Sequence, residues 1–149
     1  MSVGEICNRN VVFTYRSVVL SEAARLMRDR HVGSLIIVED TSQGRLPIGM
    51  LTDRDITVAV VAQDQDARNI AVGDAMSANP ITVREEDGVV DALQLMRRHG
   101  VRRIPVIKRD GTLAGIVTVD DLLAIVASEL SELAGAIHSG QTREAGAKH

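Results

Sequence analysis

Apolar residues follow a helical spacing in two stretches of the chain. They fall at positions i, i+3, i+4 and i+7 across Leu20–Met27, and the same spacing returns across Val89–Met96. This spacing places the apolar side chains on one face of a helix. Acidic residues 85–87 precede the second stretch and basic residues 97–99 end it, an order that the helix dipole favours. The pattern therefore predicts two amphipathic helices, the second capped by Gly100.

Short apolar and β-branched runs follow each of these helices. The expected strands are Ser34–Val38, Ile48–Leu51, Arg103–Lys108 and Leu113–Val117. Asp110-Gly111, between the last two runs, is a typical hairpin turn. A closing helix is expected to start near Asp53 in the first half and near Val119 in the second, where it runs to about His138. With a strand in front, each half has the order strand, helix, strand, strand, helix.

The two halves of the chain are copies of one unit. Val3-Gly4-Glu5 matches Val72-Gly73-Asp74 at an offset of 69 residues, and the helices match at the same offset. Later, Gly49-Met-Leu-Thr52 matches Gly115-Ile-Val-Thr118 at an offset of 66 residues. The first copy therefore carries three extra residues in the loop between positions 39 and 48.

The repeat is long and occurs only twice. This argues against an open solenoid and favours two units that bury each other's apolar faces. We expect a first unit at 1–62, a polar linker at 63–71 and a second unit at 72–138. Residues 139–149 show no apolar periodicity and are expected to form a mobile tail. The fold class predicted is α/β (α+β), with both units in one compact module.

Composition narrows the functional classes. The 149 residues carry 17 basic and 20 acidic side chains, a net charge of −3, which is not the charge of a non-specific nucleic-acid binder. Cys7 is the single cysteine, so no disulfide can form within the chain, and a reducing compartment is expected. No secretory signal is evident, and Glu129 and Glu132 interrupt the longest apolar stretch. We expect a cytoplasmic protein without a membrane partner.

The junction of the last strand and last helix could carry chemistry. It reads Gly49-Met-Leu-Thr52-Asp-Arg-Asp55 in the first copy and Gly115-Ile-Val-Thr118-Val-Asp-Asp121 in the second. Thr-x-x-Asp at this place is typical of a helix-capping box. The same geometry suits a nucleotide, because the helix start attracts a phosphate and the carboxylate can accept bonds from a ribose diol. Both interpretations remain open from the residues alone.

These motifs together resemble the CBS-domain family, named for cystathionine β-synthase, in its tandem form, the Bateman module. The resemblance spans residues 2–127. It depends on the two aliphatic-Gly-acid openings, on the paired helices, on Val101-Arg-Arg-Ile-Pro105-Val and on the two Gly-x-x-Thr-x-x-Asp junctions. Each motif is weak by itself, but the same ordered set occurs twice.

The resemblance implies a pseudo-twofold pair of β-α-β-β-α units that dimerise into a flat disk and act as sensors. Clefts between the units would bind AMP, ADP, ATP or another adenosyl ligand. By motif position, Thr52 and Asp55 would serve one site, with the base against Val12 and Val32. The second site would have Thr118 and Asp121, with the base against Ile81 and Val101. The four apolar residues could equally be core.

Basic residues near these motifs are candidates for phosphate contacts. They are Arg54, Arg102 and Arg103, although each could instead be a solvated surface charge. The first copy has Gly33-Ser34-Leu35-Ile36 where the second has Arg102-Arg103-Ile104-Pro105, so unequal affinities are expected. We find no catalytic or metal-ligand motif, and we expect a module that is not an enzyme.

The long final helix supports a different interpretation. Its apolar stripe is longer than one unit needs to cover itself. The stripe comprises Leu122, Ile125, Val126, Leu130, Leu133 and Ile137. It could form a homodimer or dock a separate effector protein without any ligand, or it could pack within the chain.

Overall fold

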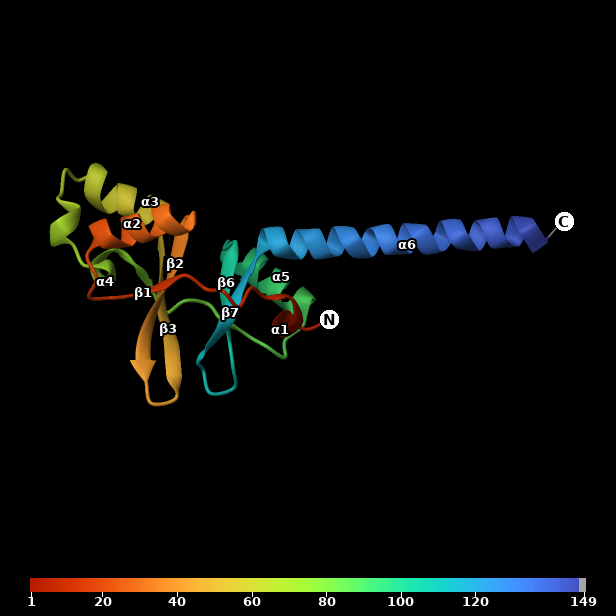
Figure 1. The fold of residues 1–149 in the computed structure, drawn as a ribbon, viewed down its shortest axis with the longest axis horizontal. Helices are drawn as coiled ribbons and strands as arrows, with labels where there is room; N and C mark the ends of the chain where they lie inside the picture. The colour runs from red at the N-terminus through yellow and green to blue at the C-terminus, as the bar shows by residue number, and fades with distance from the viewer. Residues whose placement is uncertain (148–149) are drawn as a thin grey trace.

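The computed structural model describes residues 1–147 and contains two α/β units (Figure 1). The first unit comprises β1 (Phe13–Tyr15), α2 (Leu20–Arg30), β2 (Ser34–Thr41), β3 (Gly44–Thr52) and α3 (Asp53–Ile56), which continues as a π-helical turn at Thr57–Val61. The second comprises β5 (Val83–Arg84), α5 (Val89–His99), β6 (Arg103–Ile107), β7 (Leu113–Thr118) and α6 (Val119–Ala147). The predicted element order and the mixed α/β fold class are confirmed.

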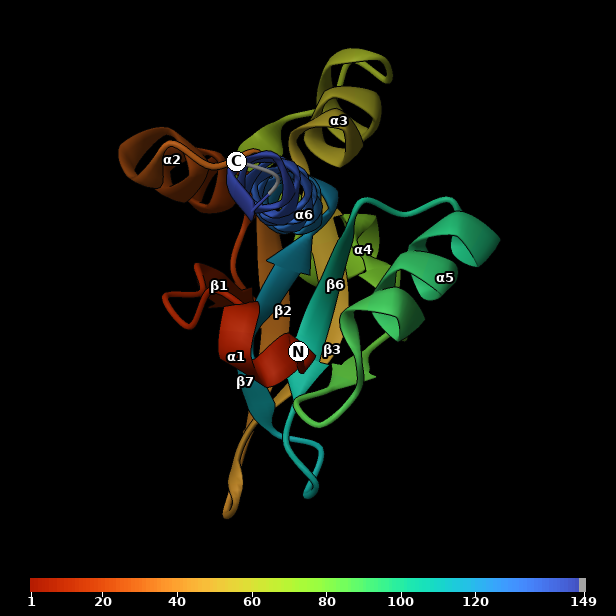
Figure 2. The same cartoon turned by 90° about the vertical axis from the view of Figure 1, so that its right-hand side faces the viewer.

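Each unit has its own β-sheet, and the two sheets face one another with the helices outside (Figures 1 and 2). The first sheet has the order β1-β2-β3-β4, where β4 is Ser77–Ala78, and the second has β5-β6-β7. In both sheets the first strand is parallel to the second, and the hairpin is antiparallel. The extra residues of the first copy lengthen the β2–β3 hairpin.

The opening segment of each copy packs on the unit formed by the other copy. The short helix α1 (Val3–Ile6) lies on the second unit, where the Val3 N–H donates to the Asp87 carbonyl at 2.8 Å. The equivalent helix α4 (Val72–Ala75) lies on the first unit, where the Val72 N–H donates to the Val18 carbonyl at 2.7 Å. The repeat boundaries in the sequence are therefore not the boundaries of the packed units.

The two hydrophobic cores include this exchange. Val72 is fully buried among Leu20, Met27 and Leu51 of the first unit. Val3 is fully buried in the second core, which is built from equivalent positions of α5, β6 and β7. Each core therefore contains a residue of the other copy, and the two units are linked by this exchange.

The segment expected to be a polar linker is ordered against the first unit. A 3₁₀ turn occupies Ala67–Asn69, and Asp66 caps it through the Arg68 N–H at 2.9 Å. Ala67 and Ile70 pack against the first core.

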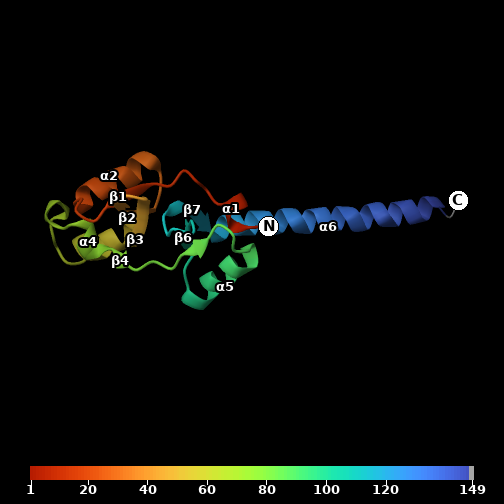
Figure 3. The same cartoon turned by 90° about the horizontal axis from the view of Figure 1, so that it is seen from below.

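Helix α6 extends far beyond the body of the protein (Figures 1 and 3). It runs to Ala147, so the expected helix end near His138 is wrong, and positions 139–147 of the expected tail are helical. The remainder of that tail, 148–149, lies outside the described residues. Leu122 is fully buried at the base of the helix, whereas residues 126–146 are exposed. By length and composition alone, Val119–Gly146 is apolar enough to cross a membrane.

Candidate ligand-binding cleft

A cavity of about 290 Å³ opens between the two units. Three parts of the chain line it: the extended segment before β1, the loop and strand start after α2, and the facing ends of β6 and β7. This volume is close to the lower end of the usual range for small-molecule sites, about 300–1,000 Å³. The cavity can therefore hold most of a nucleoside-sized ligand.

Apolar side chains of the first unit form one wall of this cleft. Val12 and Val32 line it, and both also pack against the first core. Each valine is half-buried, with the core on one side and the cavity on the other. Both interpretations given for these residues, core and pocket wall, therefore hold together.

The opposite wall belongs to the second unit. Thr118 lines the cleft at the start of α6, and Arg103 lines it from the start of β6. The backbone around Thr118 is held in place because the Val119 N–H donates to the Arg102 carbonyl at 2.9 Å. Thr118, Arg103 and the positive end of a helix thus lie across the cavity from an apolar wall, an arrangement suited to an anionic group attached to a flat ring.

The structure corrects the expected grouping of site residues. We expected Val12 and Val32 to share a site with Thr52 and Asp55, but in the cleft they face Thr118. The exchange of opening segments is the reason, because it brings the segment before β1 to the end of β7, where the Asn8 N–H donates to the Ile116 carbonyl at 2.9 Å.

The second predicted grouping follows the same exchange. The repeat offset relates Val12 and Val32 to Ile81 and Val101, and it relates Thr118 to Thr52. Ile81 and Val101 are half-buried against the second core. The repeat therefore predicts that a second site would combine them with Thr52 rather than with Thr118.

The two Thr-x-x-Asp junctions differ in their hydrogen bonds. In the first, the Asp55 N–H donates to Thr52 Oγ1 at 3.1 Å and the Thr52 N–H donates to the Asp55 carboxylate at 2.9 Å. This is a complete capping box. In the second, the Asp121 N–H donates to Thr118 Oγ1 at 3.1 Å, and no reciprocal bond to the Asp121 carboxylate is present within residues 1–147. The Asp121 carboxylate is exposed and can accept hydrogen bonds, but Asp121 lies one helical turn beyond Thr118 and does not itself line the cleft.

The candidate arginines separate into different environments. Arg103 lines the cleft. Arg102 lies 3.5 Å from Asp120, and both side chains are more than three-quarters exposed, so this pair is a surface ion pair. Arg54 is exposed on α3 and does not line the cleft.

Sequence reasoning missed several polar residues of the cleft. Asn8, Asn10, His31 and Ser34 also line it. The Asn8 side chain accepts from the Asn10 N–H at 2.9 Å, which stabilises a local turn. His31 adopts the left-handed conformation, with φ 54°, at the C-cap of α2. Its equivalence to Gly100 in the repeat was a signal that this position is a helix cap beside the cleft.

This geometry defines a duplicated α/β module with a small-molecule cleft between its halves. The sequence profile of the CBS domain matches the chain twice, at residues 3–62 and 72–128. The chain therefore belongs to the CBS-domain family and carries a tandem pair of these domains.

Two relatives illustrate the similarity. The uncharacterized protein MK0525 of Methanopyrus kandleri is 37% identical over 125 residues, which are 84% of this chain and 62% of that protein. The chain thus spans less than two thirds of this relative. Hypoxic response protein 1 of Mycobacterium tuberculosis is 33% identical over 118 residues, covering 79% of this chain and 80% of that one.

Solved structures share the fold. Hypoxic Response Protein I, crystallised with two coordinated zinc ions, superposes with a TM-score of 0.72 at 32% identity, covering 83% of this chain and 98% of that one. Within residues 1–147 of this chain, no three His, Cys, Asp or Glu side chains cluster as a metal site would require. The Arabidopsis thaliana protein CBSX2, in complex with AMP, superposes with a TM-score of 0.70 at 23% identity, covering 85% and 96%. At that identity the likeness concerns the fold alone.

Proposed function

We propose that this module is a non-catalytic sensor that binds an adenine nucleotide or a related adenosyl ligand in the cleft. One observation carries the proposal: the cleft opposes an apolar wall, Val12 and Val32, to the helix start at Thr118 and the guanidinium of Arg103. A flat base suits the valines, and a phosphate suits the opposite wall.

The Asp121 carboxylate accepts no hydrogen bond among residues 1–147, which supports a ribose between the base and the phosphate. Asp121 is one helical turn beyond Thr118, and its oxygens are not taken up by the Thr118 N–H. A carboxylate only accepts hydrogen bonds, and a ribose diol supplies two donors. The AMP complex of CBSX2, which has the same fold, is consistent with this ligand class.

A ligand in this cleft would contact both units at once. Binding therefore stabilises one relative placement of the two sheets over others, which is how a module without catalytic groups can transmit a signal to a separate effector protein.

Isothermal titration of the full chain, stripped of bound ligand, tests the proposal with AMP, ADP, ATP and S-adenosylmethionine. We expect binding of at least one of them and a loss of about tenfold in Asp121→Ala, since hydrogen bonds to a charged group contribute about 1.5–3 kcal/mol. Asp120→Ala is the matched control, because Asp120 pairs with Arg102 on the surface and does not line the cleft, and it should bind within about twofold of wild type. Absence of heat with all four ligands, or equal losses in both variants, would sink the proposal.

A second candidate function is self-association through α6. Five large apolar side chains on this helix are exposed in the single chain: Leu123, Val126, Leu130, Leu133 and Ile137. They alternate at spacings of three and four residues, which is the seam of a two-helix coiled coil. Ser128, Ser131 and Ser139 lie on the opposite face, which favours a second copy of this helix over a membrane, where an apolar surface would be needed all round.

Light scattering distinguishes this function from ligand sensing. Leu130→Glu with Leu133→Glu should convert an oligomer to monomer without ligand, whereas the control Ser131→Glu on the polar face should leave the mass unchanged. Truncation after Ala127 should act like the double variant. An unchanged oligomer in both would exclude the helix as the contact.

A further inference from the structure

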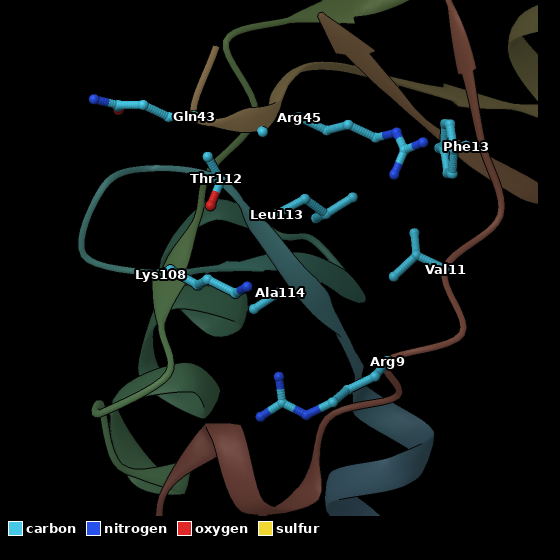
Figure 4. A pocket seen from close by; sticks show the side chains of 10 residues that line it. Arg9, Val11, Phe13, Gln43, Arg45, Lys108, Thr112, Leu113 and Ala114 are labelled. Carbon is cyan, nitrogen blue, oxygen red and sulfur yellow. The ribbon is translucent and has the colours of Figure 1, made fainter. Parts of the chain in front are cut away.

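A second cavity, of about 280 Å³, lies near the ends of the two hairpins and is separate from the cleft (Figure 4). It is enclosed by the segment leading into β1, the tip of the β2–β3 hairpin and the base of β7. The hairpins touch here, since a Cβ at Gly44 would lie 3.1 Å from Thr112 Cγ2. Gly44 and Thr112 both line the cavity.

Three basic side chains from different segments line this cavity: Arg9, Arg45 and Lys108. Its lining contains no Asp or Glu. Figure 4 shows Lys108 and Arg9 extending toward one another from opposite sides, with Arg45 lying beside Phe13. The cavity therefore concentrates positive charge, although the whole chain is acidic with a net charge of −3.

Two of these cations are held in position from outside the cavity. Arg9 donates through Nη2 to the Glu85 carboxylate at 2.8 Å and to the Gly4 carbonyl at 2.9 Å, so its other nitrogens can reach a ligand. The Arg45 guanidinium lies 4.3 Å from the centre of the Phe13 ring and 3.7 Å from Asp40. Their charges are partly offset by these acids.

Lys108 is different, because it has no ion-pair partner within 4.0 Å among residues 1–147. The nearby acid Asp110 accepts from the Thr112 hydroxyl at 2.6 Å, and this bond lowers the pKa of Asp110. The charge of Lys108 also lowers the pKa of Asp110, so this acid offsets part of the Lys108 charge, but over a longer distance than the acids that lie beside Arg9 and Arg45.

The rest of the lining is mixed. The hairpin tips contribute Gln43, Gly44 and Thr112, and the apolar part consists of Val11, Phe13, Leu113 and Ala114. A ligand that fits would combine an anionic group with a small apolar part, because the lining offers cations from several sides together with aliphatic and aromatic surface.

The extended segment 8–13 separates this cavity from the cleft. Asn8, Asn10 and Val12 line the cleft, whereas Arg9 and Phe13 line the second cavity. Successive side chains of an extended segment point to opposite sides, so the two spaces have different walls even though Val11 borders both.

The basic lining is not a product of the repeat. The residues equivalent to Arg9 and Lys108 in the other copy are Ala78 and Glu39. The repeat thus has a small residue and an acid where this cavity has two cations. The basic character is specific to one side of the module.

We propose that this second cavity binds a small phosphorylated molecule with a compact apolar part, its phosphate contacted by Lys108, Arg9 and Arg45. The proposal does not depend on nucleotide binding in the cleft. Charge-assisted hydrogen bonds from several cations to one phosphate are among the stronger polar contacts in proteins.

Titration calorimetry of the full chain with phenyl phosphate at low ionic strength tests the proposal. We expect saturable binding, a loss of about tenfold in Lys108→Gln, and no measurable binding of the neutral probe phenol. The control is Arg109→Gln, because the neighbouring Arg109 side chain is 90% exposed and does not line the cavity. It should bind phenyl phosphate within about twofold of wild type.

Competition separates this site from the cleft. Phenyl phosphate should bind equally well with AMP present, and Thr118→Val should leave its affinity unchanged. Binding without AMP affinity would reject only the cleft proposal. No saturable binding, equal losses in Lys108→Gln and Arg109→Gln, or displacement by AMP would each overturn the second site.

Discussion

The two Thr-x-x-Asp junctions share a sequence motif but make different bonds. At Thr52–Asp55 the carboxylate accepts from the threonine N–H at 2.9 Å, and the helix start is satisfied by its own residues. At Thr118–Asp121 the hydroxyl bond alone forms, and Thr118 lines the cleft. One copy of the motif therefore serves the helix, and the other leaves polar groups beside a cavity. The same motif can therefore complete a helix cap in one copy and leave polar groups available to a ligand in the other.

The units also differ where their second strands meet the first. The Ile36 N–H donates to the Val12 carbonyl at 3.2 Å, but the equivalent residue Pro105 has no N–H to donate. In agreement, β1 has three residues and β5 has two. The proline removes a hydrogen bond between the first two strands of the second unit. These strands are therefore paired less firmly than the equivalent strands beside the cleft, and the two halves differ physically at this point.

The largest expected effect concerns the exchanged opening segments. A Cβ at Gly115 would lie 2.7 Å from the Asn8 carbonyl oxygen, whereas one at the equivalent Gly49 would meet mainly the flexible end of the Met76 side chain. Gly115→Ala should lower the free energy of unfolding by about 2–3 kcal/mol and Gly49→Ala by about 1 kcal/mol, because backbone cannot move aside as a side chain can. Urea unfolding measures both.

Gly135→Ala is the control for this pair. Gly135 lies in α6 with nothing within 4 Å of the added Cβ, so the change should be neutral or stabilising by up to about 1 kcal/mol. Equal losses at Gly115 and Gly49 would contradict the asymmetry of the two contacts.

A smaller effect distinguishes the junctions without any ligand. Asp55→Ala should lower the free energy of unfolding by about 1 kcal/mol, because it removes half of a capping box. Asp121→Ala should cost about 0.5 kcal/mol or less, since it removes a helix-dipole interaction but no described bond. Thermal unfolding of both variants in the same buffer measures the difference. A larger loss in Asp121→Ala would reverse our assignment of roles.

An effect of similar size distinguishes the C-caps of α2 and α5. His31 and Gly100 occupy equivalent positions with φ of 54° and 64°. Gly100→Ala should destabilise by about 1 kcal/mol, and His31→Gly should stabilise by a few tenths to about 1 kcal/mol, because only glycine adopts this conformation without strain. Urea unfolding should therefore show shifts of opposite sign. Shifts of the same sign would mean that His31 makes contacts that outweigh its backbone strain.

Local patterns were sufficient for most of the secondary structure. The helices across Leu20–Met27 and Val89–Met96, the Asp110-Gly111 hairpin and the Gly100 cap are confirmed, because each depends on residues a few positions apart. The end of α6 was missed, because its last turns are helical without an apolar stripe that would indicate them.

The amino-acid sequence by itself determined the repeat, the order of elements and the residue types beside each helix start. Only the tertiary structure decided which copies meet: Val12 and Val32 face Thr118 because the opening segments cross between the units. A repeated sequence specifies the same local conformations whether each opening segment packs on its own copy or crosses to the other. The choice between them depends on packing between residues about a hundred positions apart, such as Asn8 and Ile116, which periodicity and turn preferences do not encode.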